Sequence, residues 1–216
     1  VTLSGPGETT RFNYSDGIWH LNDSLILDQS MRDVFLSVVS QIEIRRPVLQ
    51  AKEDSIVNIL LQNGTETSIS FGGEVLLHYW IGGNRQQQIS WIMGEDEKPY
   101  QAHIPGYQSF VAGIYAVPQE DWRSRFLLTT NFGLIRTITL EYPEQNSNLV
   151  LTYQDGFYTS SNKNVDSTKI ANLLEQISFL QADQFLSPDE AKTIRGELSE
   201  TSSIAELRFS LVNGST

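Results

Sequence analysis

The feature that most constrains the fold of this chain is an internal repeat. The pattern of residues 10–42 recurs without a gap from residue 149, and both copies open on a Tyr-x-Asp-Gly turn, at 14–17 and at 153–156. Apolar positions also align after the turn: Met31, Val34, Phe35 and Val38 fall on Ile170, Leu173, Leu174 and Ile177. Because a repeat sets the architecture before any single element is assigned, the sequence predicts two related lobes.

Each turn predicts a β-hairpin. Asp-Gly is a strong signal for a two-residue type I′ turn, because both central residues of that turn need φ > 0. In the first copy Tyr14 should then face Trp19 across the strands, and in the second Tyr153 should face Tyr158. The two copies therefore predict the same hairpin, each followed by a helix with one apolar face.

The segment between the copies predicts an antiparallel meander. A strand is expected at Val57–Leu61, and Asn63-Gly64 has the composition of a second hairpin turn that leads into a strand at Thr67–Phe71. Glycine pairs and polar turns bracket three further expected strands, at 75–81, 87–93 and 98–104.

Helices and further strands complete the expected elements. The first repeat should continue as a helix over about 28–42, and apolar residues at helical spacing predict a short helix over 107–115. Clean alternation predicts a strand over 134–142. A capping box with Pro at the first helical position predicts a helix over 187–198, and residues 207–212 alternate as a final strand.

These elements predict an α+β fold of two tandem related lobes, each an antiparallel sheet with a helix packed on one face. The first lobe spans 1–142 (hairpin, helix, meander, short helix, strand) and the second spans 143–216. Asn213-Gly214 near the end resembles a hairpin turn that has no return strand. We therefore expect the second lobe to be truncated at its C-terminus; the alternative is an incidental turn at a frayed end.

Charge and composition exclude several classes of function. The net charge is −11 and no basic run exists to neutralise phosphates, which argues against a nucleic-acid or anionic-membrane surface. The chain has no cysteine, which removes disulfides, thiolate nucleophiles and cysteine-based metal sites. No apolar run approaches the ~20 residues of a membrane span. Because the chain starts at Val1, we expect a mature form whose export signal or anchor lies outside it.

Four segments together carry a family resemblance. They are HIPGY at 103–107, DWRSRFLL at 121–128, IRTITLEYP at 135–143 and the repeated hairpin-plus-helix unit. In this order and spacing, which cover nearly the whole chain, they resemble the bacterial domain of unknown function family 4340, in the form seen in Bacteroidetes. The family has no assigned catalytic residues.

The resemblance implies a cell-envelope setting. Members look like periplasmic or outer-face envelope proteins with an N-terminal membrane segment or lipoprotein signal, often encoded beside gliding-type or auxiliary ABC transporter components. It therefore implies a non-enzymatic, extracytoplasmic accessory or protein-interaction module. Its expected partners are other envelope or transporter proteins, with membrane association only through an anchor outside this chain.

No catalytic, metal or cofactor site is predicted from the motifs. The three histidines, His20, His78 and His103, form no H-E-x-x-H or H-x-H arrangement, and no G-x-S-x-G or S-x-x-K motif occurs with the right flanks. The carboxylate clusters at 94–97, 118–121 and 187–190 are explained by turns and a helix cap. We therefore expect no enzyme activity.

The meander aromatics support an alternative function, a glycan- or peptide-binding module. Four side chains on three expected strands could form a stacking platform: Tyr79, Trp80, Trp91 and Tyr100. Adjacent residues of a strand face opposite ways, so either Tyr79 or Trp80 should belong to the core. Burial of the whole set in the core is the competing interpretation.

Trp122 and Arg123 complete the candidate binding surface, although a packed indole beside a salt-bridged guanidinium explains them equally well. The repeat itself argues against a site at Trp19 and His20, because their counterparts in the second copy are Tyr158 and Thr159. Any function peculiar to this chain is therefore expected between the copies, around residues 72–130.

Overall fold

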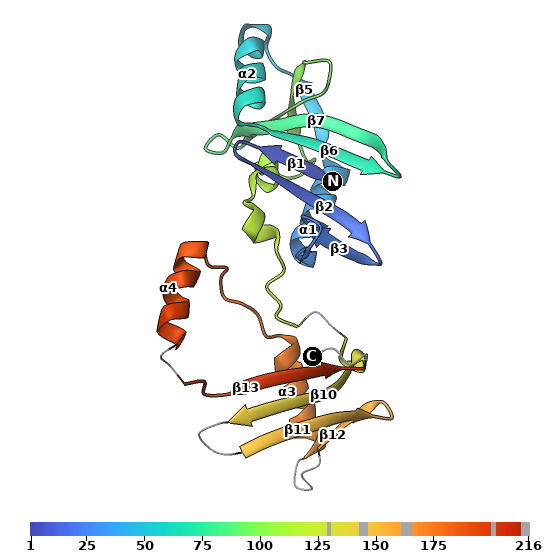
Figure 1. The fold of residues 1–216 in the computed structure, drawn as a ribbon. Coiled ribbons are helices and arrows are strands. Elements are labelled where there is room, and N and C mark those ends of the chain that lie inside the picture. The colour runs from blue at the N-terminus through green and yellow to red at the C-terminus, as the bar shows by residue number, and fades with distance from the viewer. Residues whose placement is uncertain (129–130, 143–146, 161–165, 200–201, 213–216) are drawn as a thin grey trace. The chain divides into compact units, whose positions relative to one another are not determined.

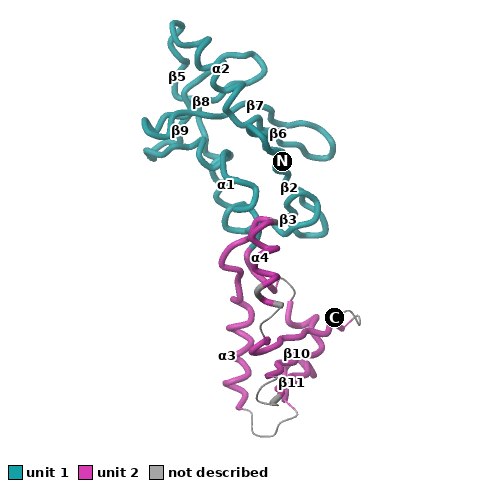
Figure 2. The backbone as a smooth tube through the Cα atoms, turned by 60° about the vertical axis from the view of Figure 1, so that its left-hand side comes forward, with its two compact units in different colours: residues 1–124 teal, residues 125–216 magenta. Residues whose placement is uncertain are grey.

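A computed structural model gives two compact units, Val1–Ser124 and Arg125–Thr216 (Figures 1 and 2). The structure describes residues 1–128, 131–142, 147–160, 166–199 and 202–212. The α+β class expected from the sequence is confirmed, since both units combine antiparallel sheet with helices.

The division between the units lies before the expected boundary at 142. Strand β10 (Ile135–Tyr142), which the sequence assigned to the first lobe, pairs on both sides with strands of the second unit. A strand belongs to the sheet that satisfies its backbone N–H and C=O groups. The alternation of apolar and polar residues along one strand does not reveal which sheet the strand joins. The boundary predicted at residue 142 was therefore misplaced.

Unit 1 contains one nine-stranded sheet in the order β4-β3-β2-β1-β6-β7-β8-β9-β5, with every pairing antiparallel. Its strands are β1 (Thr2–Gly5), β2 (Glu8–Ser15), β3 (Ile18–Leu21), β4 (Leu25–Ile26), β5 (Glu43–Pro47), β6 (Thr65–Phe71), β7 (Glu74–Asn84), β8 (Ile89–Met93) and β9 (Pro99–His103).

Helix α1 (Gln29–Gln41) connects the two edges of this sheet, since it leaves β4 at one edge and enters β5 at the other. The helix begins at the N-cap Asp28, whose carboxylate accepts a 2.9 Å hydrogen bond from the Met31 backbone N–H. Phe35 is its fully buried residue. The helix expected over 28–42 is therefore confirmed.

A helix replaces the expected strand at 57–61. Helix α2 (Glu53–Asn63) covers this segment and buries Ile56 and Leu60, which are four residues apart on one helical face. A short apolar run does not distinguish a strand from a buried helix. The hairpin expected at Asn63-Gly64 is also wrong, because Gly64 has φ −79° and caps α2 through an N–H bond to Leu60 O.

The expected helix over 107–115 is only a short 3-10 helix, η2 (Val111–Ala116). Tyr107 is exposed and pairs in an isolated bridge with Ile104, after Gly106 at φ +80°. Phe110, Ile114 and Tyr115 do pack against the core. The apolar residues of this segment therefore recur at helical spacing because a mostly irregular backbone packs several of them against the core, without forming an α-helix.

The unit 1 core is built around Trp122, which is 0% exposed, at the end of the 3-10 helix η3 (Gln119–Trp122). Its ring contacts Phe12 of β2 at 4.7 Å and Phe35 of α1 at 5.8 Å between centroids. Its carbonyl accepts a 2.8 Å hydrogen bond from the Asp28 N–H, and its indole N–H donates to Val117 O. One residue thereby links hairpin, helix and loop.

Unit 2 contains a four-stranded antiparallel sheet in the order β12-β11-β10-β13, with α3 (Ser167–Ser178) packed on its core. The other strands are β11 (Ser147–Gln154), β12 (Phe157–Ser160) and β13 (Glu206–Leu211). Helix α4 (Pro188–Ser199) begins at the expected capping box, where Ser187 and Glu190 exchange hydrogen bonds. The turn expected at Asn213-Gly214 lies outside the described residues.

Both expected Asp-Gly hairpins are confirmed. Asp16 and Gly17 have φ 53° and 81°, and residues 155–156 have φ 51° and 89°, as a type I′ turn requires. Tyr14 lies opposite Trp19 at a ring distance of 5.4 Å, and the second hairpin places its two tyrosines opposite each other at 5.1 Å.

Replacement of the central indole should destabilise unit 1 strongly. All four tryptophans lie in unit 1, so their fluorescence during denaturant unfolding reports on this unit. We expect Trp122→Ala to lower the free energy of unfolding by about 3–5 kcal/mol, because it leaves a large cavity. Phe71→Ala is the control, since Phe71 is 80% exposed. A loss below about 1 kcal/mol for Trp122→Ala would contradict this role for the indole.

Candidate functional site

The unit 1 sheet separates the four meander aromatics onto two faces. Trp91 lies opposite Gly82, whereas Tyr100 lies opposite Ile92. Because side chains alternate along a strand, Trp80 and Trp91 share the face that α2 covers. Tyr79 and Tyr100 share the other face. The four side chains therefore do not form one stacking platform.

Tyr79 belongs to the core, so the expectation that one of the Tyr79–Trp80 pair is buried is confirmed. Its hydroxyl lies 3.0 Å from the Tyr115 hydroxyl. Burial raises the pKa of both phenols, because the low-dielectric core disfavours the charged form. Both groups therefore remain neutral and serve packing.

The two indoles on the α2 face are half-buried. Trp80 and Trp91 pack against the cluster of Ile56, Leu60 and Met93. They extend the contact between α2 and the sheet, and each residue is partly exposed to solvent. Trp80 and Trp91 therefore lie on the sheet face that α2 covers and are partly accessible to solvent.

Trp122 and Arg123 do not join these aromatics. Trp122 is enclosed in the core described above, and Arg123 follows it in a backbone bridge with Leu27. The packing interpretation of Trp122 is therefore the one that the structure supports.

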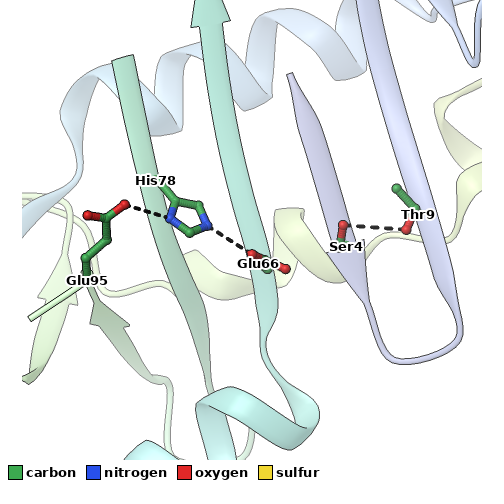
Figure 3. A network of polar contacts seen from close by, with 5 residues as sticks. All are labelled: Ser4, Thr9, Glu66, His78 and Glu95. Carbon is green, nitrogen blue, oxygen red and sulfur yellow. Dashed lines mark hydrogen bonds and ion pairs between the residues drawn. The ribbon is translucent and has the colours of Figure 1, made fainter. Parts of the chain in front are cut away.

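A polar cluster that the sequence did not predict lies on the same sheet face as Trp80. Figure 3 shows His78 of β7 between two carboxylates. Its Nε2 is 2.9 Å from Glu66 Oε1, and its Nδ1 is 3.2 Å from Glu95 Oε1. The imidazole also contacts the Trp80 ring edge-on at 4.8 Å. The cluster joins β6 and β7 to the turn between β8 and β9.

The two carboxylates favour the protonated imidazole. A neutral imidazole has one N–H, so one of the two contacts would place a bare ring nitrogen against a carboxylate oxygen. The hydrogen bond to Glu66 is the largest cause of a raised pKa at His78, with Glu95 contributing less and desolvation opposing both. Because each ring nitrogen already has a carboxylate partner, the protonated ring connects β7 to β6 and to the β8–β9 turn.

No sequence motif marks this cluster, because a β-bulge sets the register of the two strands. Counting back from the Gly72-Gly73 turn without a bulge places Glu66 opposite Tyr79, on the core face. A register shift between Ile69 and Ser70 instead places Glu66 opposite Trp80. A one-residue slip moves a side chain to the other face of a sheet, so pattern reading alone could not bring Glu66 and His78 together.

The tip of the β6–β7 hairpin exposes an apolar surface. It consists of Phe71, Val75, Leu76 and Leu77, whose exposed fractions run from 48% to 80%. The glycines between the strands have φ 61° and 88°, which fits a tight turn. We call these four residues the hairpin tip.

A small pocket lies between β5, the start of α2 and the strands β8 and β9. Its volume is about 220 Å³. Its lining residues are Arg46, Pro47, Val48, Leu49, Lys52, Ile56, Gln87, Ile89, Trp91 and Gln101. We call it the Trp91 pocket. Trp91 is the sequence-predicted binding residue that lines it.

A second cavity of unit 1, about 390 Å³, lies between the β1–β2 turn and residues 115–118. Two of its polar side chains are engaged within the protein: Thr65 Oγ1 donates to Tyr115 O, and Glu8 accepts from the Gln119 N–H. These two hydrogen bonds hold residues 115–119 against β2 and β6.

Over the part of the chain that the structure describes, no group of three or more His, Asp or Glu side chains is placed to hold a metal ion. No helix among the same residues has the length and hydrophobicity to cross a bilayer.

Comparisons of the chain with models of known families, with curated proteins and with solved structures found no match.

The His78 cluster predicts a specific pH dependence. We expect the NMR titration of the His78 ring to give a pKa above 6.5, Glu66→Gln to lower it most, and Glu95→Gln to lower it less. The pKa of His78 is raised in the folded state. The stabilisation of the fold by its pairs with Glu66 and Glu95 is therefore fully present below the unfolded-state pKa of His78 and is lost as pH rises through its folded-state pKa. A normal His78 pKa that is unchanged in Glu66→Gln would contradict the pairing of a protonated His78 with the two carboxylates.

Proposed function

We propose that this chain is a non-enzymatic protein-interaction module, an accessory domain of a bacterial envelope complex. The observation that carries this proposal is the hairpin tip. It presents four apolar side chains at the end of a two-stranded arm, with Glu74 as the one charged residue between Phe71 and Leu77. Exposed contiguous apolar surface is costly in water and marks interaction sites.

The geometry of the hairpin tip fits a protein partner. Phe71 and the three aliphatic residues lie on both strands, so the tip can insert into an apolar groove as a single unit. Burial of an apolar side chain contributes about 1.5–3 kcal/mol, which makes Phe71 the expected centre of the contact. The bulge beside Ser70 twists this end of the hairpin.

The polar chemistry of unit 1 supports a binding role over catalysis. Both nitrogens of His78 are engaged by carboxylates, which leaves the ring without a free nitrogen to take a proton from a substrate. The Tyr79 and Tyr115 hydroxyls contact each other in the core. These titratable groups therefore serve the structure of the sheet.

The envelope setting of the proposal rests on the family resemblance of the segments at 103–107, 121–128 and 135–143. On that basis the proposed module lies on the extracytoplasmic side, held by an anchor outside this chain and associated with an ABC-type, gliding-type transporter. A cysteine-free chain is compatible with an oxidising compartment.

We further propose that the two units are tandem relatives produced by duplication. Three local features support this origin. Both hairpins turn on Asp-Gly with φ > 0, both place aromatic rings opposite each other, and both lead into a helix whose N-cap is an aspartate, Asp28 or Asp166. Pairing order beyond the hairpins differs between the two sheets.

The alternative function, glycan or peptide binding by the meander aromatics, has narrower support. The platform of four rings is divided between two sheet faces, and Tyr79 is buried. What favours a binding site on this side of the sheet is the Trp91 pocket alone, so a ligand there would contact Trp91 and not the whole set.

The interaction proposal is tested by purifying the full-length, membrane-attached protein from its native host. We expect the wild type to co-purify with envelope or transporter components, and Phe71→Ser/Leu76→Ser to lose them, because two apolar contacts would be replaced by hydroxyls. The control is Ile204→Ser, which removes an equally exposed apolar residue of unit 2.

Two outcomes would contradict the proposal. Recovery of the native protein as a free cytosolic monomer would refute the envelope setting. Equal recovery of partners by wild type and Phe71→Ser/Leu76→Ser would show that the hairpin tip is not the contact surface. Circular dichroism of each variant checks that the fold is retained.

A further inference from the structure

We propose that the Trp91 pocket binds a carboxylate that carries a compact apolar side chain. This inference goes beyond the interaction function, because the pocket and the hairpin tip share no residue. It depends on three properties of the pocket: the sign of its charge, the orientation of its arginine and its apolar interior.

The charge of the pocket opposes that of the chain. The chain has a net charge of −11, yet the charged residues that line the pocket are Arg46 and Lys52, both exposed. The acidic residues of the first turn of α2, Glu53 and Asp54, are not among the lining residues. A local cationic site in an acidic protein selects an anion.

Arg46 is held in position by the neighbouring strand. It pairs with Gln101 across β5 and β9, and its Nε donates a 3.0 Å hydrogen bond to Gln101 Oε1. This bond uses one of the five guanidinium donors. The terminal nitrogens remain for a carboxylate, which arginine binds in a planar, two-pronged geometry.

The interior of the pocket is mostly apolar. Four aliphatic side chains line it together with Pro47 and the Trp91 indole: Val48, Leu49, Ile56 and Ile89. Its volume of about 220 Å³ lies below the ~300–1,000 Å³ of pockets for drug-sized ligands. The pocket therefore suits one branched or aromatic side chain beside the cationic rim.

Other anions fit the lining less well. A sugar acid carries several hydroxyls, and besides the two cations the lining offers side-chain amides only from Gln87 and Gln101. Phosphate would leave the apolar interior unfilled. A small free carboxylic acid and the C-terminal residue of a peptide present the same chemistry, and the probes below separate these two sources.

The test follows the four indole N–H signals of the ¹⁵N-labelled chain by NMR, with Trp91 assigned from Trp91→Phe. The probes are N-acetyl-leucine, 4-methylpentanoate and the neutral N-acetyl-leucinamide. We expect the two acids to move the Trp91 signal saturably while Trp19 and Trp122 stay in place, and the amide to move none. Tighter binding of N-acetyl-leucine indicates a peptide C-terminus, and tighter binding of 4-methylpentanoate a free acid.

Matched variants identify the two cations. Arg46→Ala and Lys52→Ala should each weaken binding of the acids by about tenfold, as loss of a charge-assisted hydrogen bond does. The controls Arg11→Ala and Lys98→Ala remove exposed cations that do not line the pocket, and should retain the wild-type affinity.

Four results would overturn the proposal. The first is no shift of the Trp91 signal at about 10 mM acid, where a site with a Kd near about 1 mM is filled. The second is an equal shift with the amide, and the third is unchanged affinity in Arg46→Ala/Lys52→Ala. The fourth is an equal shift with inorganic phosphate, which would show an anion site without selection for the apolar side chain.

Discussion

Unit 1 depends on the enclosure of one indole, that of Trp122. Its ring contacts Phe12 and Phe35, and its carbonyl accepts the backbone N–H of Asp28, the residue that starts α1. A loop residue far along the chain thus fixes both the hairpin and the helix of the first repeat. The same helix connects the opposite edges of the nine-stranded sheet.

Local signals predicted the local parts of this fold. Asp-Gly turns and the helical apolar spacing of 31–38 gave the repeated hairpin and helix, since both follow from backbone conformation and side-chain period. The prediction of a strand at 57–61 was wrong because the short apolar run VNILL has no periodicity that distinguishes a strand from a helix. The boundary at 142 was wrong because only long-range pairing assigns β10 to the second sheet.

The candidate sites depend on contacts that no sequence motif records. The bulge beside Ser70 brings Glu66 to the face of His78, and the β5–β9 pairing brings Arg46 to Gln101 beside Trp91. Sequence reasoning identified the aromatic residues, and strand alternation showed that they could not all be exposed. It could not say which face α2 covers, because α2 itself was expected to be a strand.

Unit 1 divides its tryptophans between an enclosed core, which holds Trp122, and a partly open face of the sheet, which carries Trp91. Hydrogen exchange of the four indole N–H groups, followed by NMR, tests this division most directly. Trp122, which is 0% exposed and donates to Val117 O, should exchange only when unit 1 unfolds, whereas Trp91 should exchange rapidly from the folded state. Rapid exchange at Trp122, or equal protection at Trp91, would contradict it.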